Sequence, residues 1–182
     1  MSKYFVSITL PKELQESLGQ ILPESRSWRK TVRRQLHLTL RYIGYADAAK
    51  VKEVDEKLAS MDVPEFTLKL KEIGFFPEKG GVRIIWIGAD KSSTLIELQG
   101  IVDKIVSEAT GSKSEHSFTP HVTLARAKGA VDKEAVRSVI SEIDEVFAFR
   151  VKSFQLMESR HAKGGTEHVT VKNYQLKTVK KQ

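Results

Sequence analysis

The sequence predicts an α+β protein whose strands pair mainly in antiparallel fashion. Segments with strand periodicity and segments with helical periodicity occur in a mixed order, and some strands follow one another directly. That order favours antiparallel neighbours over a parallel sheet. A tetrapeptide with histidine first and threonine third occurs twice, at His37 and at His121, 84 residues apart (121 − 37) in a chain of 182. The repeat predicts two similar halves.

The first third of the chain alternates between the two periodicities. Apolar and polar residues alternate over residues 4–10, which predicts a strand. Pro11 suits the first turn of a helix that is expected to run to about Ile21, because proline loses no hydrogen bond there. Residues 23–30 are predicted as a loop, and period-two alternation predicts a strand over residues 35–42.

The middle third repeats the pattern. An apolar stripe at helical spacing predicts a helix over residues 47–60, and strict alternation predicts a half-buried strand over residues 66–73. A turn is expected at residues 78–81, followed by a strand over residues 82–88 that is rich in isoleucine. Thr94 and Glu97 have the spacing of a capping box, so they are predicted to open the helix that continues to Ala109.

The last third is predicted to contain three strands and one helix. A strand is expected over residues 121–127 and a helix around Val136 to Ile143. Residues 146–156 and 168–176 are predicted as closing strands, with Gly164 and Gly165 in the turn between them. No linker-like segment interrupts the chain, so we expect a single bilobal domain over residues 1–182.

Composition limits the classes of function. The chain lacks cysteine, which excludes disulfides, thiolate metal sites and a cysteine nucleophile. No apolar stretch approaches the length of a membrane span, and the N-terminal segment has the pattern of a strand instead of a signal peptide. We therefore expect a cytoplasmic protein without a membrane partner, and a monomer by default. The net charge of +7 is compatible with polyanionic partners such as nucleic acid, but many soluble proteins without a nucleic-acid partner are also basic.

The two tetrapeptides, His37-Leu38-Thr39-Leu40 and His121-Val122-Thr123-Leu124, are the most informative feature. Residues i and i+2 of a strand point to the same face, so each motif presents an imidazole beside a hydroxyl. A single such motif is typical of a structural histidine, but a copy in each half favours catalysis.

The residue types suit phosphoryl chemistry at neutral pH. Histidine has an ordinary pKa of about 6.5, so one ring can accept a proton while the other donates one. The hydroxyls of Thr39 and Thr123 can donate to the non-bridging oxygens of a phosphate held between the rings. This scheme requires no metal ion and no cofactor.

The sequence resembles the 2H phosphoesterase superfamily, and within it the LigT-like RNA 2′,3′-cyclic phosphodiesterases, also called 2′-5′ RNA ligases. Besides the motifs, the resemblance is carried by Trp28 and residues 5–11, 75–77, 82–88, 118–126 and 157–159. It implies two mainly antiparallel sheets that face each other across a cleft, with helices outside. It also implies that His37 is the proton donor and His121 the proton acceptor.

Three further residues are expected to bind substrate. Arg126 matches an arginine that follows the second motif in the family, which favours a phosphate contact. Strict alternation would put Arg126 on the opposite face from His121, so that contact requires a bulge or a strand end. Tyr42 replaces the family's usual phenylalanine and either stacks or packs. Phe118 belongs to the core or to the wall of the cleft, or it stacks on a base. His168 stands where members often have tyrosine, so nucleoside recognition stays open.

Three hypotheses of function follow. The first is hydrolysis of RNA 2′,3′-cyclic phosphate ends, those of tRNA fragments included, to 2′-phosphates, with 2′-5′ ligation as the same chemistry with another nucleophile. The second is an enzyme of the same mechanism acting on a small cyclic nucleotide or ADP-ribose cyclic phosphate. The third is a module that binds RNA ends without turnover.

His116, in the segment before the second motif, would border the site.

Overall fold

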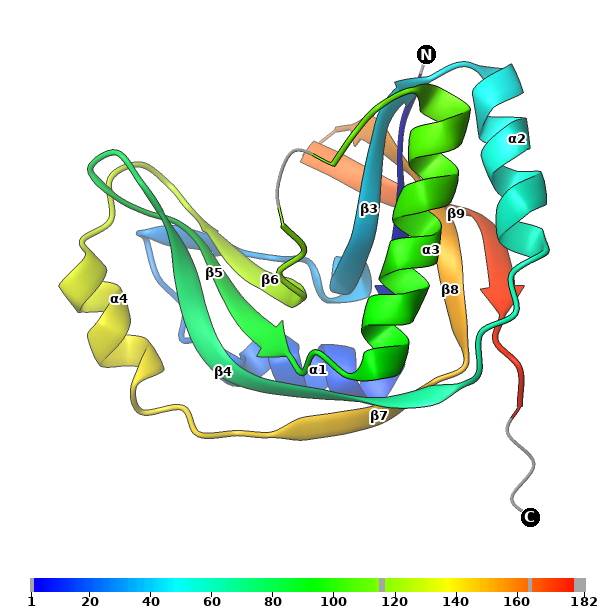
Figure 1. Ribbon diagram of the computed structural model, residues 1–182. Coiled ribbons are helices and arrows are strands. Elements are labelled where there is room, and N and C mark those ends of the chain that lie inside the picture. Colours follow the sequence, from blue (N-terminus) through cyan, green and yellow to red (C-terminus); the bar gives the residue numbers. More distant parts are fainter. Residues whose placement is uncertain (1, 115–116, 164, 179–182) are drawn as a thin grey trace.

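The computed structural model describes residues 2–114, 117–163 and 165–178 (Figure 1). His116 and Gly164 lie outside the described residues. The elements follow in this order: β1 (Ser2–Thr9), α1 (Lys12–Ile21), β2 (Trp28–Lys30), the 3₁₀ helix η1 (Arg33–Gln35), β3 (His37–Ala46), α2 (Ala48–Ala59), β4 (Phe66–Glu78), β5 (Gly81–Ala89), α3 (Ser93–Thr110), β6 (His121–Ala127), α4 (Lys133–Ile140), β7 (Phe147–Val151), β8 (Ser153–Ala162) and β9 (Gly165–Gln175).

The strands form one strongly curled sheet in the order β7-β4-β5-β6-β3-β1-β8-β9, with β2 beside β6. Every pair of named neighbours is antiparallel, so the α+β prediction is confirmed. Figure 1 shows the two halves rising on either side of β6. The two expected sheets are joined, because a single residue pair, Leu38 opposite Val122, connects β3 to β6.

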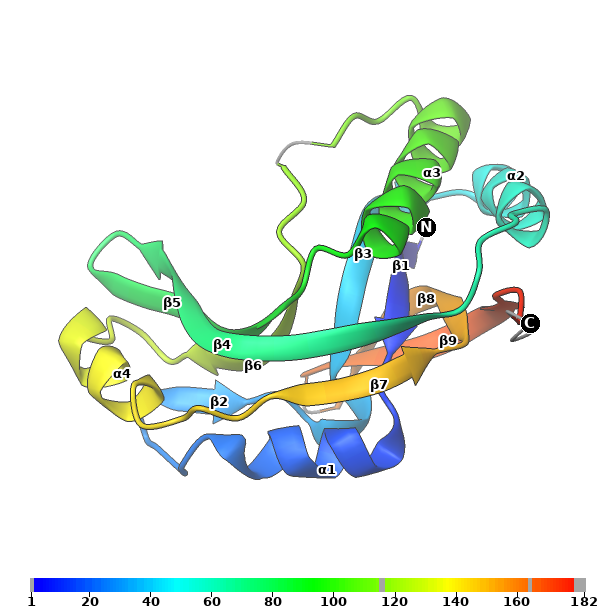
Figure 2. The same ribbon diagram turned by 60° about the horizontal axis from the view of Figure 1, so that its bottom comes forward.

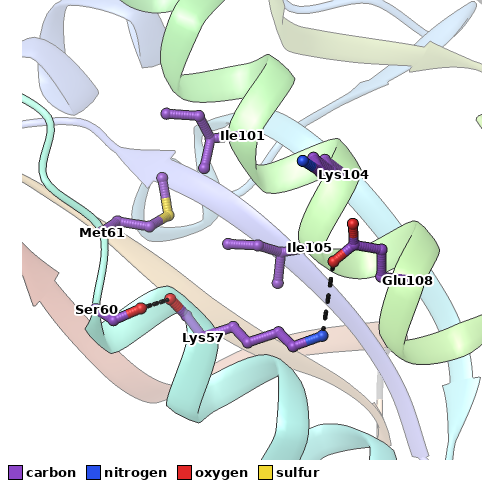
Figure 3. Close-up of a pocket in the computed structure, with 7 residues that line it drawn as sticks. All are labelled: Lys57, Ser60, Met61, Ile101, Lys104, Ile105 and Glu108. Atoms are coloured by element: carbon purple, nitrogen blue, oxygen red, sulfur yellow. Dashed lines mark hydrogen bonds and ion pairs between the residues drawn. The ribbon is translucent and has the colours of Figure 1, made fainter.

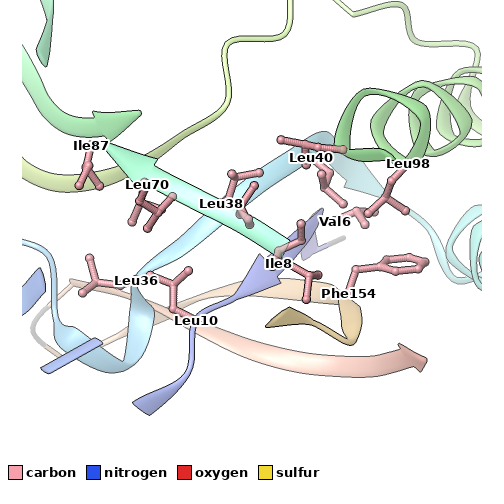
Figure 4. Close-up of a cluster of buried hydrophobic side chains, with 14 of the residues drawn as sticks. Val6, Ile8, Leu10, Leu36, Leu38, Leu40, Leu70, Ile87, Leu98 and Phe154 are labelled. Carbon is pink, nitrogen blue, oxygen red and sulfur yellow. The ribbon is translucent and has the colours of Figure 1, made fainter. Parts of the chain in front are cut away.

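One hydrophobic core runs through both halves. It lies on the face of the sheet that carries Leu38 and Val122, both of which have no exposed surface. Leu40 of β3 lies near Leu98 of α3 in this core (Figure 4), and α1 covers the same face beneath β2 (Figure 2). Because this face is filled by apolar side chains and helices, polar residues of the central strands are directed to the other face.

Several local predictions were wrong. Gly165, expected in a turn, is the first residue of β9 and pairs with Ala162. Residues 28–30 form the strand β2 instead of a loop, because they pair with β6. Helix α3 is capped by Ser92, whose side chain accepts from the Leu95 amide, so Thr94 lies inside the first turn. The segment 146–156 divides at Lys152, since β7 pairs with β4 while β8 pairs with β1 and β9. The errors at β2 and at Lys152 concern strand partners that local periodicity does not specify.

Candidate active site

The two histidine motifs meet where the halves of the sheet join. In an antiparallel pair, opposite residues share a face and the register runs in opposite directions. From the pair Leu38–Val122, one step in either direction brings His37 opposite Thr123 and Thr39 opposite His121. Leu38 and Val122 point into the core, so these four polar side chains lie together on the other face, which we call the histidine face.

The backbone fixes each imidazole in the same way. Nδ1 of His37 donates to the carbonyl oxygen of Gln35 at 2.7 Å, and Nδ1 of His121 donates to the carbonyl oxygen of Thr119 at 2.7 Å. A carbonyl only accepts, so Nδ1 carries the hydrogen in each ring. The neutral rings therefore present Nε2 as the nitrogen that can take a proton, and Thr39 Oγ1 lies 3.1 Å from Nε2 of His37.

Aromatic rings hold both imidazoles from the side. The ring of Phe5 lies 5.0 Å from that of His37, and the ring of Phe76 meets that of His121 edge to face at 4.9 Å. Trp86 packs against Phe76 at 5.4 Å and approaches His121 at 6.3 Å. Packing of this kind limits the rotation of a side chain, so the aromatic neighbours restrict the orientation of both imidazoles.

A bulge follows each motif at the same position. Leu40 has no partner on β1, because Ser7 pairs with Thr39 and Val6 with Arg41. Leu124 likewise has no partner on β5, because Trp86 pairs with Thr123 and Ile85 with Ala125. An extra residue reverses the alternation of faces beyond it. Tyr42 and Arg126, each five residues after its histidine, are thereby returned to the histidine face.

The structure brings a third histidine to this face. The ring of His168, on β9, lies 5.2 Å from the ring of His37 in an edge-to-face arrangement and 4.9 Å from the ring of Phe5. Its Nδ1 is buried without a hydrogen-bond partner among the described residues. The sequence predicted a strand at His168 and left its part in nucleoside recognition open. The pairing of β9 with β8, and of β8 with β1, carries His168 towards His37.

The electrostatics of the site favour an anion. Burial, together with the positive charges of His168, His121 and Arg126, lowers the pKa of His37 to about 4, although the hydrogen bond to the carbonyl of Gln35 acts in the opposite direction. Burial and then Arg126 lower the pKa of His121 and of His168 as well. No carboxylate is among the groups that shift these three pKa values. Within residues 2–114, 117–163 and 165–178, Arg126 forms no ion pair with an acidic side chain.

Phe118, the remaining predicted site residue, is partly buried and packs against the hydrophobic core. Among the described residues, no contact between its ring and a motif histidine is found. In the same described segments, no group of three or more histidine or acidic side chains is placed to hold a metal ion, and no helix is long and apolar enough to cross a membrane.

A cavity of about 380 Å³ lies elsewhere, between α2 and α3 (Figure 3). Its floor is apolar, formed by Met61, Ile101 and Ile105, and an ion pair between Lys57 and Glu108 closes one side. Because it contains no histidine and no residue of either motif, this cavity is separate from the candidate site.

Comparison with known proteins gives consistent matches. The model of the 2′-5′ RNA ligase superfamily matches residues 10–163. A Methanocaldococcus jannaschii protein named RNA 2′,3′-cyclic phosphodiesterase is 26% identical over 176 residues, which cover 94% of this chain and 99% of the relative. An Aeropyrum pernix protein of the same name is 32% identical over 138 residues, covering 74% and 78%. The crystal structure of E. coli LigT complexed with 3′-AMP matches with a TM-score of 0.80 and 27% identity, covering 96% and 98%.

Proposed function

The chain belongs to the 2′-5′ RNA ligase superfamily, and we propose that it hydrolyses the 2′,3′-cyclic phosphate at the end of an RNA by two-histidine acid–base catalysis. The observation that carries the proposal is the pair Leu38–Val122, which brings His37, Thr39, His121 and Thr123 onto one face. The related proteins named RNA 2′,3′-cyclic phosphodiesterase support the choice of substrate.

In the proposed reaction, the cyclic phosphate lies between the two imidazoles. His121 accepts a proton from water through Nε2 as the water oxygen attacks phosphorus. His37 donates a proton through Nε2 to the departing 3′ oxygen, and the product is a 2′-phosphate. The hydroxyls of Thr39 and Thr123 donate to the non-bridging oxygens, and these bonds strengthen as negative charge builds on them.

The negative charge of the substrate favours the protonated form of the proton donor. With a pKa of about 4, the ring of His37 is neutral at pH 7 in the free protein. A phosphodiester anion beside the ring raises the pKa of His37, because an opposite charge favours the protonated form. Proton donation is thereby linked to the presence of substrate. Arg126 adds a positive charge for the phosphate oxygens, and its guanidinium suits their geometry.

The same site accounts for ligation within this proposal. If the 5′-hydroxyl of a second RNA takes the place of water, His121 accepts the proton of that hydroxyl. The bond formed is then a 2′-5′ phosphodiester, and the 3′ oxygen leaves as before. No second site is needed.

The test is an end-product assay on a short RNA with a 2′,3′-cyclic phosphate, run in EDTA with the wild type, His37→Ala and His121→Ala. Loss of either proton-transfer group is expected to lower turnover by about 10²- to 10⁴-fold. His161→Ala is the control, because His161 is an exposed histidine of β8. The mechanism is wrong if either motif variant keeps most of its activity. A wild type that converts only small cyclic nucleotides would favour the second hypothesis.

A further inference from the structure

The short strand β2 takes the place beside β6 that β3 leaves free. β3 meets β6 at the pair Leu38–Val122, whereas β2 pairs with β6 at its other end, from Ala125 to Ala127. The Thr31 amide also donates to the Leu124 carbonyl at 2.8 Å. β2 is therefore fixed in register next to the second motif.

The side chains of β2 show which way each one points. Trp28 is buried in the core and its Nε1 donates to the carbonyl of Pro23, and Nζ of Lys30 donates to the carbonyl of Leu22 at 3.0 Å. Both side chains thus lie on the α1 side of the sheet. Successive side chains of a strand alternate, so Arg29 points to the histidine face.

Arg29 lies directly opposite Arg126. Opposite residues of an antiparallel pair have Cβ atoms about 4.5–5.5 Å apart, and like charges in such a pair are destabilising. Both side chains are exposed, and neither forms an ion pair with an acidic residue in the described part of the chain. Two unneutralised guanidiniums side by side are typical of a surface that binds more than one negative charge.

We propose that Arg29 binds the phosphate that precedes the cyclic phosphate in the RNA chain. The inference rests on the proposed function, since it assumes that the cyclic phosphate lies at the two histidines. Arg126 comes next to Thr123 on the histidine face, and Arg29 comes next to Arg126, so the positive charge leads away from the histidines towards β2. A cyclic mononucleotide has no second phosphate to place there. Arg29 therefore makes the site selective for a polynucleotide.

The experiment compares two trinucleotides that both end in a 2′,3′-cyclic phosphate. One has ordinary phosphodiester linkages, and the other carries a neutral methylphosphonate at the linkage just before the cyclic phosphate. The wild type is expected to hydrolyse the cyclic phosphate of the charged substrate with a kcat/KM about tenfold higher than that for the methylphosphonate substrate. A factor of this size corresponds to one charge-assisted contact. Arg29→Gln should hydrolyse the cyclic phosphates of both substrates with equal kcat/KM, and Arg29→Lys should keep part of the preference for the charged linkage. Lys12→Gln is the control, because it removes one charge from an exposed position on α1, on the core side of the sheet.

A preference for the charged linkage that persists in Arg29→Gln would overturn the inference, and so would a wild type without any preference. Equal loss of activity on both substrates would overturn it too, because Arg29 would then act on the cyclic phosphate itself. Failure of the proposed function has a different signature, since the wild type would then leave the cyclic phosphates of both trinucleotides unopened.

Discussion

Acid should destabilise this protein through His37, and the structure sets the size of the effect. The folded protein holds the pKa of His37 at about 4, mainly because the ring is buried. In the unfolded chain the pKa of a histidine is about 6.5. Between these two values the unfolded chain binds more protons than the folded one, so the free energy of unfolding falls as the pH drops below 6.5. The loss is complete below about pH 4.

The gap between the two pKa values gives the magnitude. Each unit of difference corresponds to about 1.4 kcal/mol, so His37 can account for up to about 3 kcal/mol of lost stability, and for about 2.5 kcal/mol at pH 4.5. Partial access of solvent to the ring reduces these figures. The total stability of a small protein is about 5–15 kcal/mol, so the effect is large enough to measure.

The assay is urea unfolding of the wild type and His37→Gln at pH 7.5 and at pH 4.5. Carboxylates also titrate in this range, but they do so in both proteins and cancel in the comparison. The stability of the wild type relative to His37→Gln should fall by about 2 kcal/mol on going to pH 4.5. His161→Gln is the matched control and should follow the wild type. The reasoning is refuted if the difference between wild type and His37→Gln stays constant within about 0.5 kcal/mol, the effect of an ordinary surface substitution.

Two further predictions concern the surroundings of the histidines. A Cβ at Gly74 would lie 2.5 Å from the ring of Trp86, so Gly74→Ala should cost about 1–3 kcal/mol by urea unfolding and lower kcat/KM as Trp86 shifts against His121. Gly100→Ala, where a Cβ meets nothing within 4 Å, should keep or raise the free energy of unfolding. A Gly74→Ala variant more stable than Gly100→Ala would contradict this account. Arg126→Gln should raise the pKa of all three histidines of the site, because the charge of Arg126 lowers them; NMR titrations with unchanged values would disprove it.

Several features of the site follow from local sequence alone. The alternation of apolar and polar residues predicts strands over both motifs, and it places His37 with Thr39, and His121 with Thr123, on the polar face of each strand. These statements depend only on the two-residue period of a strand and on the burial of Leu38 and Val122. The resemblance carried by the motifs also anticipated the antiparallel α+β fold.

The positions of Tyr42 and Arg126 required the structure. Simple alternation sends both to the face opposite the histidines, and only the bulges at Leu40 and Leu124 bring them back. A bulge is a mismatch between two strands. It depends on the partner's register as much as on the bulged residue, so the sequence of one strand does not determine it.

The sequence by itself determined which side chains each strand offers: an imidazole and a hydroxyl, twice, on a polar face. Only the tertiary structure decided which strands meet, and so which side chains lie together. The pair Leu38–Val122 joins the two motifs, β9 brings His168 beside His37, and β2 sets Arg29 opposite Arg126. The physical reason is that periodicity reports which face of a strand is buried, whereas the choice of neighbouring strand comes from contacts between residues far apart in the chain.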